Sequence, residues 1–218
     1  MKLDELRGDS RFSFAAGFLV GATIMARRAA AIEALSVDQV DDDIRIEHRS
    51  YVVSSIMQAA AAVESEVAEV AMHGPGHHLG SDRIDADARD YLQPLADVID
   101  DQNPALERYA LVLHLLRKAA FDRGGQPWQD AALVMRLRNE VVHYKSKWGA
   151  EMTQAKLWRS LQALRHPKPP FTEDATNFFP QRCLSAACAA WAAATSVAFY
   201  DRLSIASPLE GYRHRLQL

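Results

Sequence analysis

Alanine-rich stretches with few helix breakers constrain the fold of this chain more than any other feature of its sequence. Among 218 residues there are only 10 glycines and 9 prolines, and four consecutive alanines occupy positions 59–62. Alanine is the residue that costs least to place in an α-helix. No internal repeat and no convincing strand pattern is present. We therefore predict an all-α fold, in which helices pack as a bundle.

Helical spacing of the apolar residues, with capping and helix-breaking residues at the ends, predicts seven helices. They cover residues 12–35, 41–72, 86–99, 104–121, 128–145, 150–164 and 181–203. The stretches 73–85 and 166–180 together hold three of the ten glycines and five of the nine prolines, and they are predicted loops. Small residues cover much of the last helix, so we expect it at the centre of the bundle. We interpret residues 1–218 as one domain, with an N-terminal helical extension at 1–40 and a helical bundle at 41–206.

The net charge and the cysteine content of the chain indicate what kind of RNA site it could have and in which compartment it works. The net charge is −3 and the isoelectric point is near 6.2, so any RNA site has to be a local basic patch. Two cysteines, Cys183 and Cys188, form no disulfide framework, and we expect both in the core. This usage predicts a reducing, cytoplasmic location.

The apolar stretch 12–26 (FSFAAGFLVGATIMA) raises the question of a membrane span. It has 15 residues, whereas a spanning helix needs about 20. Acidic residues precede it, which does not fit the basic start of a signal peptide. We expect a buried amphipathic helix and no membrane contact, with a membrane anchor as the less favoured alternative.

The segment 138–143 (RNEVVH) holds the strongest chemical signal. Asn139 and His143 lie four residues apart on one predicted helix, and the long side chain of Arg138 can reach the same face. Arginine grips phosphate with a fixed fork of donors, and histidine transfers protons near neutral pH. These groups are suited to cleaving RNA without a metal ion or other cofactor. Tyr144, Lys145 and Lys147 follow and are expected to bind flanking phosphates.

The spacing of arginine and histidine alone is not specific. Similar spacings occur at Arg108–His114, Arg159–His166 and Arg136–His143. The pair at positions 138 and 143 differs because asparagine follows the arginine directly and apolar residues flank the motif at helical spacing.

Residues 137–145 (LRNEVVHYK) resemble the Leu-Arg-Asn-x-x-x-His stretch of the HEPN superfamily. Residues 51–70 are similar to the early HEPN helix, which is alanine-rich with a glutamate near its end. Residues 179–200 look like the closing helix of a bacterial HEPN-like subgroup. Only the Arg-Asn-x-x-x-His core is a specific match.

The resemblance implies an all-α bundle and a homodimer with its active sites in the cleft between protomers. It also implies metal-independent RNA cleavage, with Arg138 and His143 as the catalytic pair and Asn139 as their polar companion. Such proteins often act in toxin–antitoxin or antiphage systems, where an antitoxin or another regulatory protein is a partner. Other HEPN domains do not cut RNA. The alternative is therefore an inactive HEPN-like dimer that binds RNA, a nucleotide or a partner protein.

Structural interpretations stay open beside these functional ones. Arg138 and His143 could simply pack or cap a helix in a structural interaction protein. The histidines of the 73–85 loop (His73, His77 and His78) are expected to be solvated rather than metal-bound. Three glutamates of the second helix, Glu64, Glu66 and Glu69, lack the Glu-x-x-His pairs of a di-iron bundle and are expected on a solvated face. Trp148 and Trp158 either line the motif or anchor the packing.

Overall fold

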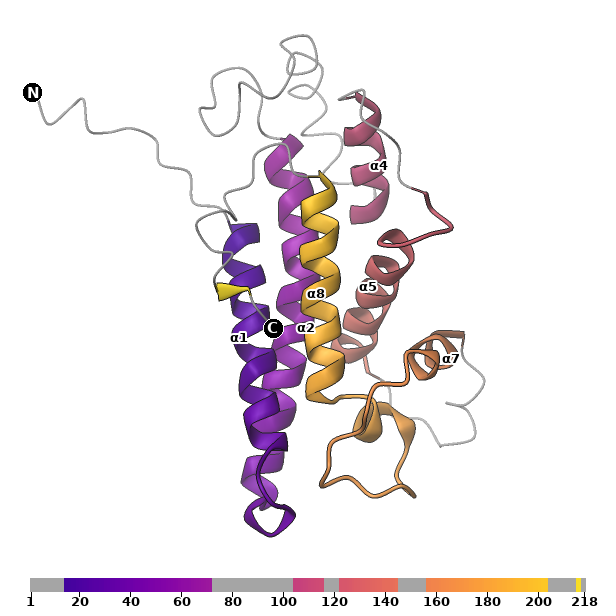
Figure 1. The fold of residues 1–218 in the computed structure, drawn as a ribbon. Helices are drawn as coiled ribbons and strands as arrows, with labels where there is room; N and C mark the ends of the chain where they lie inside the picture. Colours follow the sequence, from indigo (N-terminus) through magenta and orange to yellow (C-terminus); the bar gives the residue numbers. More distant parts are fainter. Residues whose placement is uncertain (1–13, 72–103, 116–121, 145–155, 204–214, 217–218) are drawn as a thin grey trace, which may run out of the picture.

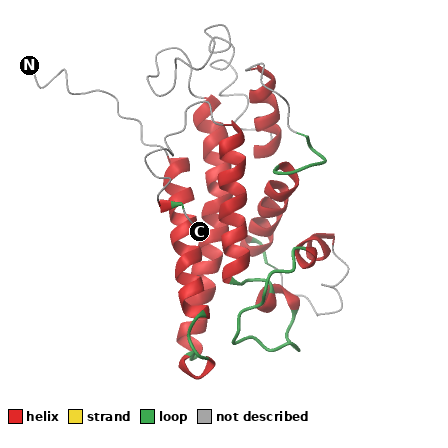
Figure 2. Ribbon diagram, in the orientation of Figure 1, coloured by secondary structure: helices red, strands yellow, loops and turns green. Residues whose placement is uncertain are grey.

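The protein is described by a computed structural model over residues 14–71, 104–115, 122–144, 156–203 and 215–216. In these ranges the elements are helical, with no strand, which confirms the predicted all-α fold (Figures 1 and 2). The helices are α1 (Phe14–Glu33), α2 (Asp42–Ala71), α4 (Ala105–Leu115), α5 (Trp128–Val142), α7 (Lys156–Ala163) and α8 (Ala186–Leu203). A 3-10 turn, η2 (Val37–Gln39), joins α1 to α2, and a π-helical turn, η4 (Phe178–Arg182), precedes α8.

Three helices, α1, α2 and α8, form the tight centre of the bundle (Figure 1). Alanines fill their shared core, and because an alanine side chain is small, the helix backbones approach closely. The hydroxyl of Ser55 on α2 donates to the carbonyl of Ala22 on α1 at 2.8 Å. Ser196 on α8 donates to the carbonyl of Ala59 on α2, also at 2.8 Å. The second bond, together with the packing of α8 against both α1 and α2, confirms the predicted central position of the last helix.

The other helices pack along one side of this centre. Leu137 of α5 is fully buried in the same core as the alanines. Trp158 of α7 stacks on Phe179, with 4.4 Å between ring centroids, so this tryptophan anchors the packing. At the other end of the bundle, Tyr109 of α4 meets Phe199 of α8 edge to face at 4.5 Å. The result is a layer of shorter helices against a three-helix centre.

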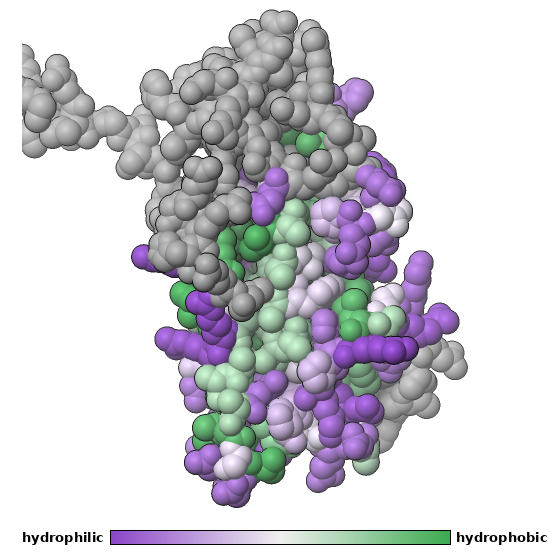
Figure 3. Space-filling view, viewed as in Figure 1, coloured by the Kyte–Doolittle hydropathy of each residue, from purple (hydrophilic) through white to green (hydrophobic). Residues whose placement is uncertain are grey.

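Helix α1 is long and apolar enough to cross a membrane by length and composition, the single such helix among the described residues. In the structure, Ala15, Ala16 and Leu19 are buried against residues of α2 and α8. The same test is passed by core helices of proteins that cross no membrane. Since α1 packs along both α2 and α8, it is part of the bundle rather than a detached extension. Figure 3 shows apolar residues along the central helices of this face, flanked by hydrophilic ones.

The predicted end of α1 and the predicted start of α2 agree with the structure to within two residues, whereas two other boundaries were wrong. Helix α5 ends at Val142, because His143 leaves the helical region with φ −108° and ψ 28°. Helix α8 begins at Ala186 rather than at residue 181, because residues 181 and 182 belong to the separate turn η4 and residues 183–185 after it belong to no helix. The predicted helix 86–99 and the loop 73–85 lie outside the described residues, as do parts of the predicted helices 104–121 and 150–164.

Candidate nucleic-acid site on α5

Arg138 projects from α5 toward α2, where its guanidinium forms an ion pair with the carboxylate of Glu64. Helix α5 buries Leu133, Val134 and Leu137 in the core, which places Arg138 at the edge of the contact with α2. The arginine side chain is 24% exposed and that of Glu64 is 38% exposed. The pair is therefore accessible from solvent, and an anionic ligand would compete with Glu64 for the guanidinium.

Asn139 and His143 are both exposed. The backbone N–H of His143 donates to the carbonyl of Asn139 at 2.9 Å, which closes the last turn of α5. The two residues therefore lie one turn apart, as the sequence predicts. Arg138 precedes His143 by five residues, or about 1.4 helical turns, and it faces α2. Within one protomer the three side chains share the end of α5, with Arg138 turned toward Glu64 of α2.

The aromatic neighbours of the motif form a small packed group. Tyr144 is exposed over part of its surface, and its ring lies 5.5 Å from that of Phe179. Phe179 in turn stacks on Trp158, as described above. This contact fixes the chain just beyond the end of α5. Lys145, Lys147 and Trp148 lie outside the described residues.

Glu64 is the site residue that the sequence interpretation missed. The prediction of a solvated face was wrong for Glu66. Glu64 is held by Arg138, and Glu66 is buried at 4% exposure. A signal was present, because a carboxylate in an alanine-rich, core-facing helix needs a cationic or hydrogen-bonding partner. His73, His77 and His78 lie outside the described residues, and the side chain of Glu69 is also not described. Among the residues that are described, no cluster of metal-ligating side chains is found.

The chemistry available at this end of α5 combines one half-buried cation, one exposed amide and one exposed imidazole. The guanidinium of Arg138 can bind a phosphate oxygen if its ion pair with Glu64 breaks. The imidazole of His143 can accept a proton from a bound ligand or donate one to it. Two groups on one protomer that face different directions can meet on one substrate if a second protomer supplies one of them.

No protein-family model matches the chain, and no curated protein or solved structure is similar enough to be counted as a relative.

Proposed function

We propose that this chain is a metal-independent endoribonuclease of the HEPN type, which works as a homodimer in a toxin–antitoxin or antiphage-defence system. The observation that carries the proposal is the solvent access of Arg138, Asn139 and His143 at one end of a helix in an all-α bundle. On this proposal the protein acts in the cytoplasm, on RNA, under the control of an antitoxin or another regulatory protein.

Each residue of the motif has a role in the proposed reaction. His143 removes the proton of the ribose 2′-hydroxyl or protonates the leaving 5′-oxygen. Arg138 stabilises the negative charge that grows on the phosphorane. Asn139 orients the phosphate or the imidazole, and Tyr144, Lys145 and Lys147 hold the flanking phosphates. Cleavage in a cleft between two protomers lets Arg138 of one act with His143 of the other.

The ion pair between Arg138 and Glu64 favours a second candidate function. A guanidinium whose charge is balanced by a neighbouring carboxylate stabilises a phosphorane less well. It can still bind another anion in place of that carboxylate. The second candidate is therefore an inactive HEPN-like dimer that binds RNA, a nucleotide or a partner protein.

A cleavage assay in EDTA tests the first proposal. The purified chain, His143→Ala, Arg138→Ala and the control His114→Ala are each incubated with RNA. His114 is an exposed histidine on α4, on a different helix from the motif, so its removal should leave cleavage unchanged. Loss of cleavage in the two motif variants alone supports the nuclease. Equal cleavage by all four proteins, or by none, removes it.

Binding and oligomer measurements separate the second candidate from a purely structural role. RNA binding without cleavage, weakened by Arg138→Ala, supports the inactive binding module. Light scattering during size-exclusion chromatography tests the homodimer that both candidates require. A monomer at all concentrations that binds no RNA contradicts both.

A further inference from the structure

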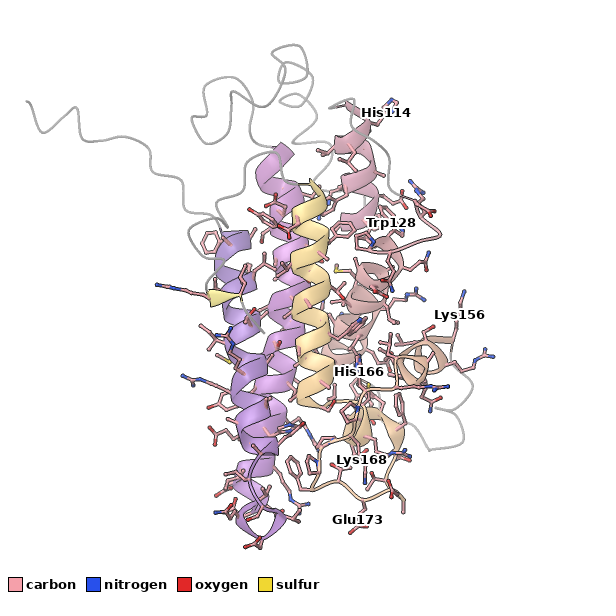
Figure 4. The ribbon with its side chains drawn as sticks, in the orientation of Figure 1. His114, Trp128, Lys156, His166, Lys168 and Glu173 are labelled. Atoms are coloured by element: carbon pink, nitrogen blue, oxygen red, sulfur yellow. The ribbon has the colours of Figure 1, made fainter. Side chains whose placement is uncertain are left out.

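A cavity of about 290 Å³ opens between the first turns of α2 and the segment that leads into α8. Arg45, His48 and Arg49 of α2 form one wall, and Phe171, Thr172 and Gln181 form part of the other. In Figure 4, Lys168 and Glu173 mark this segment at the end of the molecule where α2 begins. The nuclease motif does not contribute to the cavity.

Two arginines give the cavity its charge. Arg45 and Arg49 lie one helical turn apart, and neither forms an ion pair or a side-chain hydrogen bond with a described residue. The guanidinium of Arg45 lies over the ring of Phe171, with 5.8 Å from its Cζ atom to the centroid. Glu173 is the one carboxylate among the described residues that line the cavity, and it is exposed. Like charges four residues apart on a helix repel each other, so a shared anion would stabilise them.

The wall beside the arginines is held in place. His48 is buried, its Nε2 atom lies 2.8 Å from a carboxylate oxygen of Glu33, and its ring meets Phe171 edge to face at 5.0 Å. On the facing segment, Lys168 donates to the carbonyl of Thr172 and pairs with Asp174 at 3.0 Å. Phe171 and Thr172 are thus positioned before any ligand arrives, which lowers the entropic cost of binding.

Gln181, which lines the same cavity, has an unmet hydrogen-bonding group. Its Oε1 atom is buried and has no hydrogen-bond partner. A buried acceptor without a donor destabilises the fold, and such groups are rare in folded proteins unless a ligand or water satisfies them.

We infer that this cavity binds a small molecule that carries an oxyanion group, a phosphate monoester or a carboxylate, together with a hydrogen-bond donor. The guanidiniums of Arg45 and Arg49 hold the oxyanion, because arginine binds both groups with paired hydrogen bonds. The donor reaches Gln181, and the ring of Phe171 covers the apolar part. A cavity near the lower end of the ~300–1,000 Å³ range fits a ligand of metabolite size.

The cavity is separate from the proposed nuclease site. Arg45 and Glu64 lie on the same helix 19 positions apart, which corresponds to about 28 Å along its axis. Binding of an oxyanion in this cavity therefore does not depend on RNA cleavage. His143→Ala should bind the oxyanion as the unmodified protein does.

Isothermal titration calorimetry of the full chain tests the site with two probes, inorganic phosphate and succinate, in a chloride buffer free of other oxyanions. Arg45→Gln and Arg49→Gln are compared with Arg27→Gln, an exposed arginine of α1 with the same change of charge. We expect saturable binding of at least one probe. It should weaken about tenfold in each α2 variant, because each variant loses a charged hydrogen bond to the oxyanion. It should persist in Arg27→Gln.

The two probes identify the chemistry, and a further variant checks that the site is built rather than merely basic. Binding of phosphate alone assigns a phosphate monoester, and binding of succinate alone assigns a carboxylate. Gln181→Leu should weaken binding of hydrogen phosphate, which carries a donor, more than binding of succinate. No saturable binding of either probe, or equal weakening in Arg27→Gln and Arg49→Gln, overturns the inference. Thermal unfolding of each variant verifies that it is folded.

Discussion

A carboxylate oxygen of Glu33 lies 2.8 Å from Nε2 of His48, and this contact ties the end of α1 to the first turns of α2. The same oxygen accepts the backbone N–H of Ala186 at 2.7 Å, at the start of α8. The side chain of Glu33 is 15% exposed and that of His48 is 3% exposed. One carboxylate thus joins the three central helices at one end of the bundle.

Replacement of Glu33 by alanine should lower the free energy of unfolding by about 2–4 kcal/mol. The reason is that the imidazole of His48 and the N–H of Ala186 both lose a partner in a buried place. Urea denaturation of the variant measures the change. The matched control is Glu107→Ala, which removes a carboxylate from the exposed pair with Arg123. An exposed pair contributes about 0–1 kcal/mol, so equal losses in the two variants would contradict this role for Glu33.

The tight packing of alanines predicts that a leucine destabilises the fold at one position of α8 and is tolerated at the next position. Ala193 is fully buried between the central helices, whereas Ala194 is exposed. Ala193→Leu should destabilise the fold by about 1–3 kcal/mol or more, because the neighbouring backbones must move to admit the side chain. Ala194→Leu should change stability by less than about 0.5 kcal/mol, because leucine is a good helix former. Chemical denaturation measures the free energy of unfolding of both variants. Equal values would show that the three central helices can move apart to admit a leucine without loss of stability.

The parts of the fold that depend on local pattern were predictable from sequence. The predicted helix 12–35 is observed as Phe14–Glu33, and the predicted helix 41–72 as Asp42–Ala71. Alanine content and apolar spacing determine such helices within their own segments. The start of α8 was placed too early because the break at residues 183–185, between η4 and α8, contains no glycine or proline to mark it in the sequence.

Site features that join distant segments were not predictable in this way. Glu64 and Arg138 are 74 residues apart in sequence, and only the packing of α5 on α2 brings them together. The cavity beside Arg45 and Arg49 needs the segment around Phe171 to fold back onto α2. The arginine spacing on a helix face was visible in the sequence, but the opposite wall of the cavity was not.

The two cysteines should be inert in the native protein. Cys183 and Cys188 are buried free thiols, and the pKa of Cys183 is raised, first by its hydrogen bond with Cys188 and then by burial. An exposed cysteine ionises near pH 8.5, so Cys183 should stay protonated there. Iodoacetamide at this pH should modify the native chain slowly and the chain in guanidinium chloride rapidly, as followed by mass spectrometry.

The same pKa direction predicts how stability changes with pH. A thiol whose pKa is higher in the folded state than in the unfolded state favours unfolding once the unfolded thiol ionises. The contribution of Cys183 to stability should therefore be complete below about pH 8.5 and decline above it. Cys183→Ala should reduce this alkaline loss. Fast modification of both thiols in the native protein would contradict the buried arrangement.

The competition between Glu64 and RNA for Arg138 gives a prediction that rests on the proposed function. Glu64→Gln removes the negative charge beside the guanidinium and should tighten RNA binding about two- to fivefold, since a partly exposed ion pair contributes about 0.2–1 kcal/mol. Fluorescence anisotropy with a single-stranded RNA in EDTA measures the affinity, in a His143→Ala background so that the RNA stays intact. Glu107→Gln carries the same charge change on α4 and should have little effect. In an Arg138→Ala background the gain from Glu64→Gln should disappear, because the guanidinium that it frees is no longer there. Equal gains from Glu64→Gln and Glu107→Gln would mean that net charge alone governs binding and that Arg138 does not contact the RNA.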